Sequence, residues 1–119
     1  MGVNSRYFTV QEFVCPCCND QAMSRIFIAR LDQARGLAGV PFVLTSAWRC
    51  YQHNLDVGGK ETSSHLFGLA VDIAVTNSRD RYKIVNALLN VGFTRIGIGK
   101  DFIHVDMDNT KDAEVIWLY

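Results

Sequence analysis

One short apolar run with a carboxylate in its middle constrains this chain more than any other feature. Residues 69–75 are apolar apart from Asp72, are partly β-branched, and follow Gly68. This pattern is typical of a fully buried β-strand. A carboxylate in such a strand is costly unless a cation or several hydrogen-bond donors satisfy it. Backbone amides of a neighbouring loop could donate to the Asp72 carboxylate. Alternatively, Asp72 could bind a metal ion, with His65, which the Gly68 turn would bring near, as a second ligand.

A second expected strand repeats the anomaly. Residues 102–107 alternate so that His104 and Asp106 share one face and apolar residues share the other. A single histidine on a strand is more often a hydrogen-bonded core residue than a ligand. Here two strands carry such groups, and His65, Asp72 and His104 together offer three nitrogen and oxygen ligands. Catalytic zinc characteristically has three protein ligands and an open fourth position, so the residues predict a Zn²⁺ site.

Several short motifs follow one another in order along the chain. They are Glu12-Phe13-Val14-Cys15, Thr45-Ser46-Ala47-Trp48-Arg49, Asn54-Leu55-Asp56-Val57-Gly58-Gly59, Ser63-Ser64-His65, Gly68-Leu69-Ala70-Val71-Asp72 and His104-Val105-Asp106. Over residues 7–106 the chain thereby resembles the zinc D-alanyl-D-alanine carboxypeptidase family, in the carboxypeptidase-like branch that includes many phage cell-wall enzymes. The resemblance implies a hedgehog/DD-peptidase-like fold, zinc held by the three predicted ligands, and the peptide of bacterial peptidoglycan as substrate.

The resemblance also implies an acidic catalytic base three positions before the last histidine, which is Asp101. An odd separation along a strand would place Asp101 on the wrong face, but a turn at Lys100-Asp101 would remove that objection. Asp106 is the rival, although its position favours orienting a ligand. A surface turn aspartate is the plain alternative for Asp101.

Three further residues are candidates for substrate binding. Arg49 occupies the place of an arginine that in related enzymes is thought to hold the substrate carboxylate or steady the oxyanion, tasks that suit the guanidinium fork. Ser64 would hydrogen-bond near His65, and Trp48 would form a wall of the substrate pocket. The alternatives are a surface ion pair, a turn serine and a core aromatic residue.

The cysteines leave three readings open. A Cys₃His structural zinc site is one possibility, with ligands from Cys15-x-x-Cys18 and Cys50-x-x-His53, although Cys17 is an additional cysteine that this ligand set leaves out. A disulfide between Cys50 and one of the other three would suit an extracellular enzyme. Reduced, buried thiols are the third possibility.

Length and pattern predict one domain over residues 1–119. Helical spacing over residues 20–37 and 79–90, with strands elsewhere, predicts an α+β fold with two main helices and a mostly antiparallel sheet. The net charge of zero argues against nucleic-acid binding, and the lack of a long apolar run argues against a membrane protein. We expect a monomer.

The expected function is hydrolysis of a peptide bond in peptidoglycan stem peptides, by carboxypeptidase or endopeptidase action. Because no apolar segment follows the first residues, we expect a phage endolysin or virion-associated enzyme, made in the cytoplasm and brought to the cell wall by phage-assisted release or in a virion. The alternative is an inactive, zinc-stabilised peptidoglycan-binding or virion structural module, since hedgehog signalling domains keep the zinc of related peptidases while serving as binding modules. A thiol redox protein is a weaker third reading.

Overall fold

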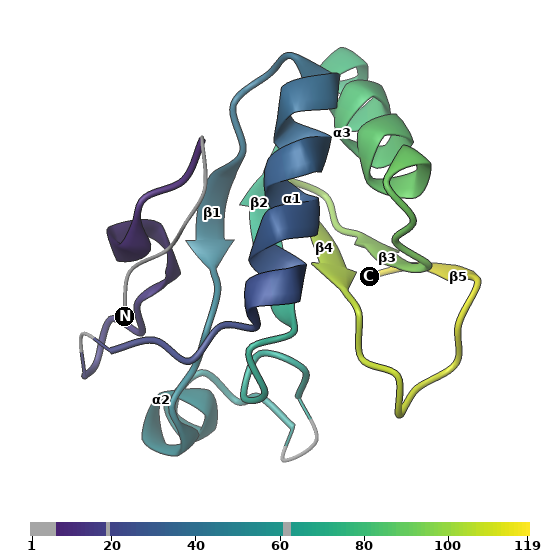
Figure 1. Ribbon diagram of the computed structural model, residues 1–119. Coiled ribbons are helices and arrows are strands. Elements are labelled where there is room, and N and C mark those ends of the chain that lie inside the picture. Colours follow the sequence, from purple (N-terminus) through teal and green to yellow (C-terminus); the bar gives the residue numbers. More distant parts are fainter. Residues whose placement is uncertain (1–6, 19, 61–62) are drawn as a thin grey trace.

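A five-stranded sheet with two long helices on one face forms the part of the chain that the computed structural model describes, residues 7–18, 20–60 and 63–119 (Figure 1). The fold is α+β, as the sequence predicts. In chain order the elements are η1 (a 3₁₀ helix, Val10–Phe13), α1 (Arg25–Ala38), β1 (Val43–Ser46), α2 (Tyr51–Asp56), β2 (Ala70–Ala74), α3 (Ser78–Asn90), β3 (Arg95–Ile98), β4 (Phe102–Asp106) and β5 (Val115–Leu118).

The sheet is mixed rather than wholly antiparallel. Its strands lie in the order β1-β2-β4-β3-β5, and β3 and β5 are parallel while the other neighbours are antiparallel. The β3–β4 hairpin turns at Gly99 to Asp101, as the sequence indicates. The chain after β4 then returns through residues 107–114 to the start of β3. Because of that return, β5 runs in the same direction as β3.

Local capping sets the ends of the long helices. The Ser24 hydroxyl accepts from the backbone of Phe27 at 3.3 Å, so α1 begins later than the apolar spacing indicates, and Gly39 ends it at φ 69°. The Asn77 side chain accepts from Asp80 at 2.9 Å and starts α3. Side-chain caps of this kind satisfy amides that the first turn leaves unpaired. Neither helix, nor any other in the described residues, is long and apolar enough to span a membrane.

The short helix α2 is an addition to the two helices that the sequence predicts. It has six residues and buries only Asn54, so it has no apolar stripe that periodicity could detect. The Cys50 sulfur accepts from the backbone of His53 at 3.4 Å and caps its first turn.

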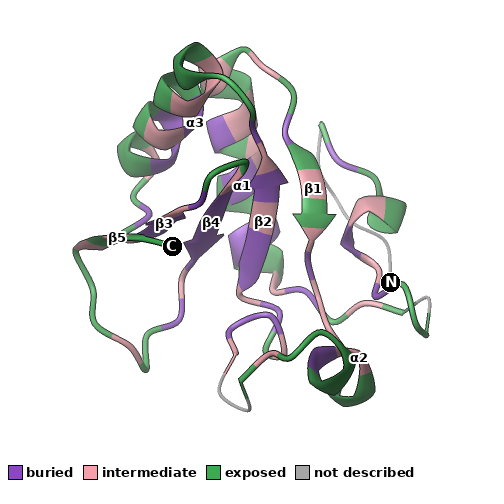
Figure 2. Cartoon of the chain, turned by 180° about the vertical axis from the view of Figure 1, so that it is seen from behind, coloured by how far each residue is buried: buried purple, intermediate pink, exposed green. Residues whose placement is uncertain are grey.

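The core lies between α1 and α3 and one face of the sheet. Val71 and Ile73 of β2 and Ile103 and Val105 of β4 are fully buried in it. Each such side chain contributes roughly 1.5–3 kcal/mol through burial. Because side chains alternate along a strand, the intervening residues face the other way. Seen from that side, no helix of the described chain crosses in front of β2 and β4 (Figure 2).

Candidate metal centre and active site

A row of opposed residues crosses the sheet and builds the site. From β1 to β5 its members pair as Ser46, Asp72, His104, Gly97 and Trp117. Directly opposed residues in neighbouring strands share a face, so this row gathers on the side away from α1. The register thus brings Asp72 and His104 together, although they are far apart in the sequence.

The three predicted metal ligands converge at this row. The His104 Nδ1 atom lies 2.9 Å from Asp72 Oδ1, and the His65 Nε2 atom lies 3.4 Å from the same oxygen. One ligand atom from each residue lies within 4.8 Å of the others. Both imidazoles are buried, and Asp72 is only partly exposed. This is a compact set of two nitrogen donors and one carboxylate oxygen.

The loop before β2 positions His65. Gly68 adopts φ 69°, and a Cβ atom there would lie 2.0 Å from the carbonyl oxygen of Ala22, so only glycine fits the turn. The His65 Nδ1 atom lies 2.7 Å from the carbonyl oxygen of Ala47. With that nitrogen donating to the carbonyl, Nε2 keeps its lone pair toward Asp72.

The second histidine is oriented by a carboxylate. Asp106 Oδ2 accepts from His104 Nε2 at 2.7 Å, while Asp106 Oδ1 accepts from Arg95 Nε at 2.7 Å and from the backbone of Asp108 at 3.1 Å. Both oxygens of this buried carboxylate are therefore engaged. By holding Nε2, Asp106 directs His104 Nδ1 toward Asp72. Carboxylates commonly orient metal-binding histidines in this way.

These contacts also shift the protonation equilibria. Burial would raise the pKa of Asp72, but its hydrogen bonds with His104 and His65 outweigh burial and hold that pKa well below its usual range. Burial alone would lower the pKa of His104, and the carboxylates of Asp106 and Asp72 raise it instead. The pKa of Asp106 is lowered, because bonds with His104, Asp108 and Arg95 overcome the effect of burial. The site therefore favours ionised carboxylates at Asp72 and Asp106. Either a proton on the His104 imidazole or a bound cation supplies the positive charge beside them.

A cavity of about 660 Å³ opens over the three residues. Four of the side chains that line it are cationic: Arg49, Lys60, Arg95 and Lys111. These four residues form a positively charged rim, and the Asp72 carboxylate lies at the floor of the cavity.

Two aromatic residues at the C-terminal end close one side of the cavity. The Trp117 ring lies 5.5 Å from the His104 ring, and the Tyr119 ring packs 4.9 Å from that of Phe102. A Cβ atom at Gly97 would lie 2.6 Å from both Trp117 and Tyr119. The absence of a side chain at Gly97 thus lets both rings lean over the sheet. Burial raises the pKa of Tyr119, so this phenol stays neutral near pH 7.

The comparison with protein families agrees with this geometry. Residues 6–106 match the family described as Peptidase M15. The chain belongs to the peptidase M15 family. No curated protein matches it.

The side chains present in this M15 chain fit the zinc ion on which peptidases of the family generally depend. His65 and His104 each have one ring nitrogen engaged by an acceptor and the other turned to Asp72. Two imidazoles and a carboxylate are typical ligands of catalytic zinc, with space left for water. The cavity supplies that space.

Among the residues predicted to bind substrate, Arg49 reaches the cavity. It donates from Nε to Ser46 Oγ at 3.3 Å and from Nη1 to Asn54 Oδ1 at 3.2 Å, and its Nη2 lies 3.9 Å from Asp72 Oδ2. Ser64 also lines the cavity, where it donates to Asp108 at 2.8 Å. The guanidinium is thus held beside the predicted metal position.

Trp48 and Asp101 are not brought to the cavity. The Trp48 indole donates to the carbonyl oxygen of Leu66 at 3.1 Å, and its ring packs against the core. Asp101 lies in the exposed β3–β4 turn, where its carbonyl oxygen accepts from Val75 at 3.0 Å. Within the described chain, the carboxylates that line the cavity are those of Asp72 and Asp106.

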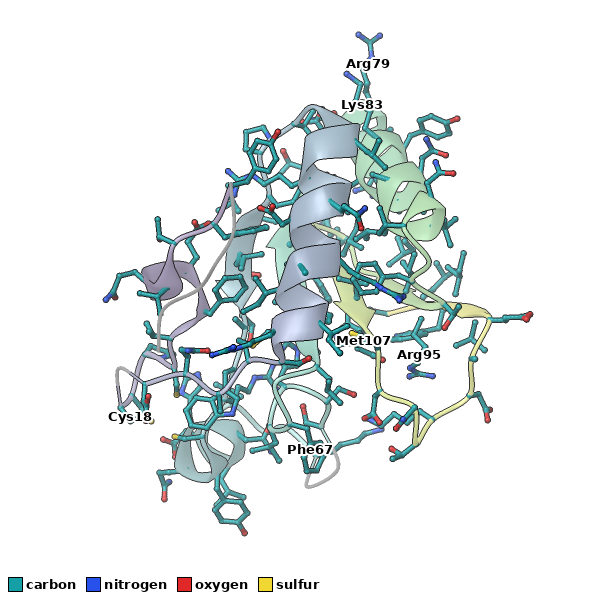
Figure 3. All side chains as sticks on the ribbon, viewed as in Figure 1. Cys18, Phe67, Arg79, Lys83, Arg95 and Met107 are labelled. Atoms are coloured by element: carbon teal, nitrogen blue, oxygen red, sulfur yellow. The ribbon has the colours of Figure 1, made fainter. Side chains whose placement is uncertain are left out.

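Sequence reasoning did not single out Lys60, Arg95, Lys111, Trp117 and Tyr119, which line the cavity, or Asp108, which accepts from Ser64 beside it. Of these, Arg95 is opposed to Asp106 in the sheet, and its side chain lies beside the connection between β4 and β5 (Figure 3). Lys111 donates to Ser64 at 2.9 Å. Lys111, Trp117 and Tyr119 reach the cavity because the chain returns to β3 after β4, and no short motif signals that path.

The cysteines form a separate cluster outside this cavity. Cys15, Cys17, Cys18 and Cys50 each offer a sulfur within 4.8 Å of the others, and His53 is not part of that group. All four thiols are free. Burial opposes ionisation of Cys15, but hydrogen bonds from Cys50 and Cys17 lower its pKa to about 6.

Proposed function

We propose that this M15 peptidase hydrolyses a peptide bond in the stem peptides of bacterial peptidoglycan. The observation that carries the proposal is the convergence of His65, Asp72 and His104 on the floor of a cavity with a cationic rim. Stem peptides carry free carboxylates, and a cationic rim is complementary to them. An open position beside the three ligands is what hydrolysis at a metal requires.

Arg49 is the residue that we propose holds the substrate carboxylate or the developing oxyanion. Its Nη1 and Nε atoms are tied to Asn54 and Ser46, at 3.2 and 3.3 Å, so the guanidinium is fixed before substrate arrives. A fixed donor stabilises developing charge with little reorganisation during the reaction. Lys60 and Lys111, from two different loops, supply further positive charge along the rim.

A zinc ion bound by the three ligands would acidify a water molecule and polarise the scissile carbonyl. The protein's own task is to keep the two imidazoles in place. Ala47 fixes His65 and Asp106 fixes His104, each through a 2.7 Å contact. We propose that activity depends on Asp106 as a positioning residue and not on Asp101, because Asp101 lies in an exposed turn away from the cavity lining.

Digestion of purified peptidoglycan, followed by mass spectrometry of the muropeptides, tests the proposal. The native protein should shorten or open stem peptides, and a chelator should stop the reaction until zinc is returned. Asp72→Asn should be inactive. Asp112→Asn is the matched control, since Asp112 is exposed and Arg95 donates to its backbone carbonyl and not to its carboxylate.

The masses of the products would also assign the bond, separating D-alanyl-D-alanine carboxypeptidase action from endopeptidase cleavage. If walls of several types yield no zinc-dependent product but still retain the protein, the proposal fails. A peptidoglycan-binding or virion structural module would then explain the site.

We further propose that the enzyme acts at the bacterial cell wall, as a phage endolysin or a virion component. The proposed substrate supports this location. Lysis of host cells on expression with a holin, and its loss with Asp72→Asn, would test the endolysin form.

A further inference from the structure

We propose that Cys15, Cys17, Cys18 and Cys50 form a second metal site, in which a zinc ion bound by four thiolates fastens the N-terminal segment to the loop that carries Arg49. The proposal is independent of the peptidase function. It rests on four cysteine sulfurs that gather from two separate parts of the chain, each within 4.8 Å of the others. Four thiolates are a common ligand set of structural zinc.

The spacing of the sulfurs suits a metal at their centre. With a zinc–sulfur distance near 2.3 Å, a regular tetrahedron has a sulfur–sulfur edge of about 3.8 Å. The Cys15 sulfur lies 3.6 Å from that of Cys17 and 3.6 Å from that of Cys50. The Cys17–Cys50 contact, at 2.9 Å, has to lengthen by roughly 1 Å when the ion binds.

A disulfide explains the cluster less well. Bonded sulfurs lie about 2.05 Å apart, and all four thiols here are free. A bond between Cys17 and Cys50 would leave Cys15 and Cys18 as unused thiols beside it. A metal ion accounts for all four residues at once.

Backbone amides donate to three of the four sulfurs in the cluster. The amide of His53 donates to Cys50 Sγ at 3.4 Å, the amides of Cys17 and Cys50 donate to Cys15, and that of Asp20 donates to Cys18. Zinc with four thiolates carries a net negative charge, and donors to the sulfurs offset it. Such outer contacts are typical of metal ligands and hold them in place.

The location indicates what the ion would do. Cys15, Cys17 and Cys18 follow η1, while Cys50 directly precedes α2, and Cys18 lies on the α2 side of the molecule (Figure 3). Four protein ligands leave no open position for substrate, so the site would be structural. Because Arg49 is adjacent to Cys50 in the chain, an ion at the cluster would also limit the movement of that arginine.

Metal analysis of the full chain, purified in the presence of zinc under reducing conditions, tests the proposal. The native protein should hold two zinc ions. The double variant Cys17→Ser/Cys18→Ser should lose one of them, and both of its positions are exposed, so the change leaves the core intact. The matched variant His104→Ala should retain the ion of the thiol site.

Cobalt substitution gives a second readout that does not depend on activity. Cobalt in the His104→Ala variant should show intense sulfur-to-metal charge-transfer absorption, and the double cysteine variant should lose it. Thiol titration of native protein should find all four cysteines protected until a chelator removes the metal. A protein that binds zinc at His65, Asp72 and His104 alone, or that contains a Cys17–Cys50 disulfide after reducing purification, would overturn the proposal.

If the double variant does not fold, the native protein still decides the matter through thiol protection and the cobalt spectrum. Failure of peptidase activity would leave these results unchanged. The two proposals can therefore fail separately.

Discussion

The sheet site and the cysteine cluster bring potential ligands together in opposite ways. At the sheet site, β2 and β4 fix Asp72 opposite His104 by register, and both histidines are buried. In the cysteine cluster the ligands come from irregular segments next to η1 and α2, and Cys17 and Cys18 are exposed. One set depends on the sheet for its geometry, whereas the other would depend on the metal itself.

The difference also separates an open site from a closed one. Three ligands of the sheet site lie under a cavity of about 660 Å³, with a guanidinium beside them. The four sulfurs of the cluster lie within 4.8 Å of one another and would fill all four positions of a tetrahedral zinc ion. We infer that the first arrangement serves chemistry on a substrate and the second holds two segments of the chain together.

The largest expected effect sharpens this comparison directly. His104→Ala should reduce peptidoglycan hydrolysis by roughly 10³-fold or more, because the metal's stabilisation of the transition state is worth several kcal/mol. The thermal midpoint of His104→Ala should change less than that of the double cysteine variant. Cys17→Ser/Cys18→Ser should instead lower the thermal midpoint by roughly 10 °C or more, since metal binding contributes to folding. Calorimetry and a muropeptide assay on both proteins would measure the two effects.

The opposite pattern would break the comparison. If the cysteine variant were as stable as the native protein but inactive, the cluster would have a role in catalysis and not in folding.

The second effect concerns the two carboxylates near His104. Asp106→Asn should lower kcat by about 10- to 100-fold, because the partner of a metal ligand usually has an effect of that size. Asp101→Asn should retain at least about half of the native rate, since its side chain is exposed and away from the cavity. Initial rates on a soluble stem peptide, together with zinc affinity, would check both variants. A severe defect in Asp101→Asn with unchanged zinc binding would restore Asp101 as the base.

A smaller effect is expected at Gly97. Replacement by alanine places a Cβ atom 2.6 Å from Trp117 and Tyr119, so both rings must move from the cavity wall. KM should rise by roughly 10-fold, with a smaller change in kcat, because the wall contacts substrate and not the reacting bond. Gly36→Ala in α1 is the control, and its kinetics should match those of the native protein. Equal kinetics for Gly97→Ala and the native protein would remove the two aromatic residues from substrate binding.

The smallest effect is the acid dependence that Asp108 contributes. Burial acts against its charge, but bonds from Thr110, Ser64 and Lys111 lower the pKa of Asp108 from 3.8 to about 2. A depressed pKa means that the stabilisation is present above about pH 4 and is lost as the pH falls toward 2. Asp108→Asn should therefore be less stable than the native protein at neutral pH, with the gap narrowing in acid. Urea unfolding at several pH values would measure the difference in free energy of unfolding between the two proteins. A difference that does not change with pH would show that the Asp108 charge does not stabilise the fold.

Much of the site was predictable because its ligands lie in strongly patterned segments. A carboxylate in an apolar strand and a histidine in an alternating strand are anomalies that the sequence itself displays, and the structure places Asp72 opposite His104. The β3–β4 turn was predictable as well, because it begins with Gly99. The parallel β5 strand was not, since strand direction depends on the path of a long connection and not on local pattern.

Residue types and periodicity by themselves determined the α+β class, the two long helices and the candidate ligands His65, Asp72 and His104. Only the tertiary structure decided that Trp117 and Tyr119 wall the cavity, that Asp101 and Trp48 stay outside it, and that Cys50 joins three other cysteines and not His53. The physical reason is that a side chain's chemistry is local, whereas its neighbours are set by sheet register and by where the connections return.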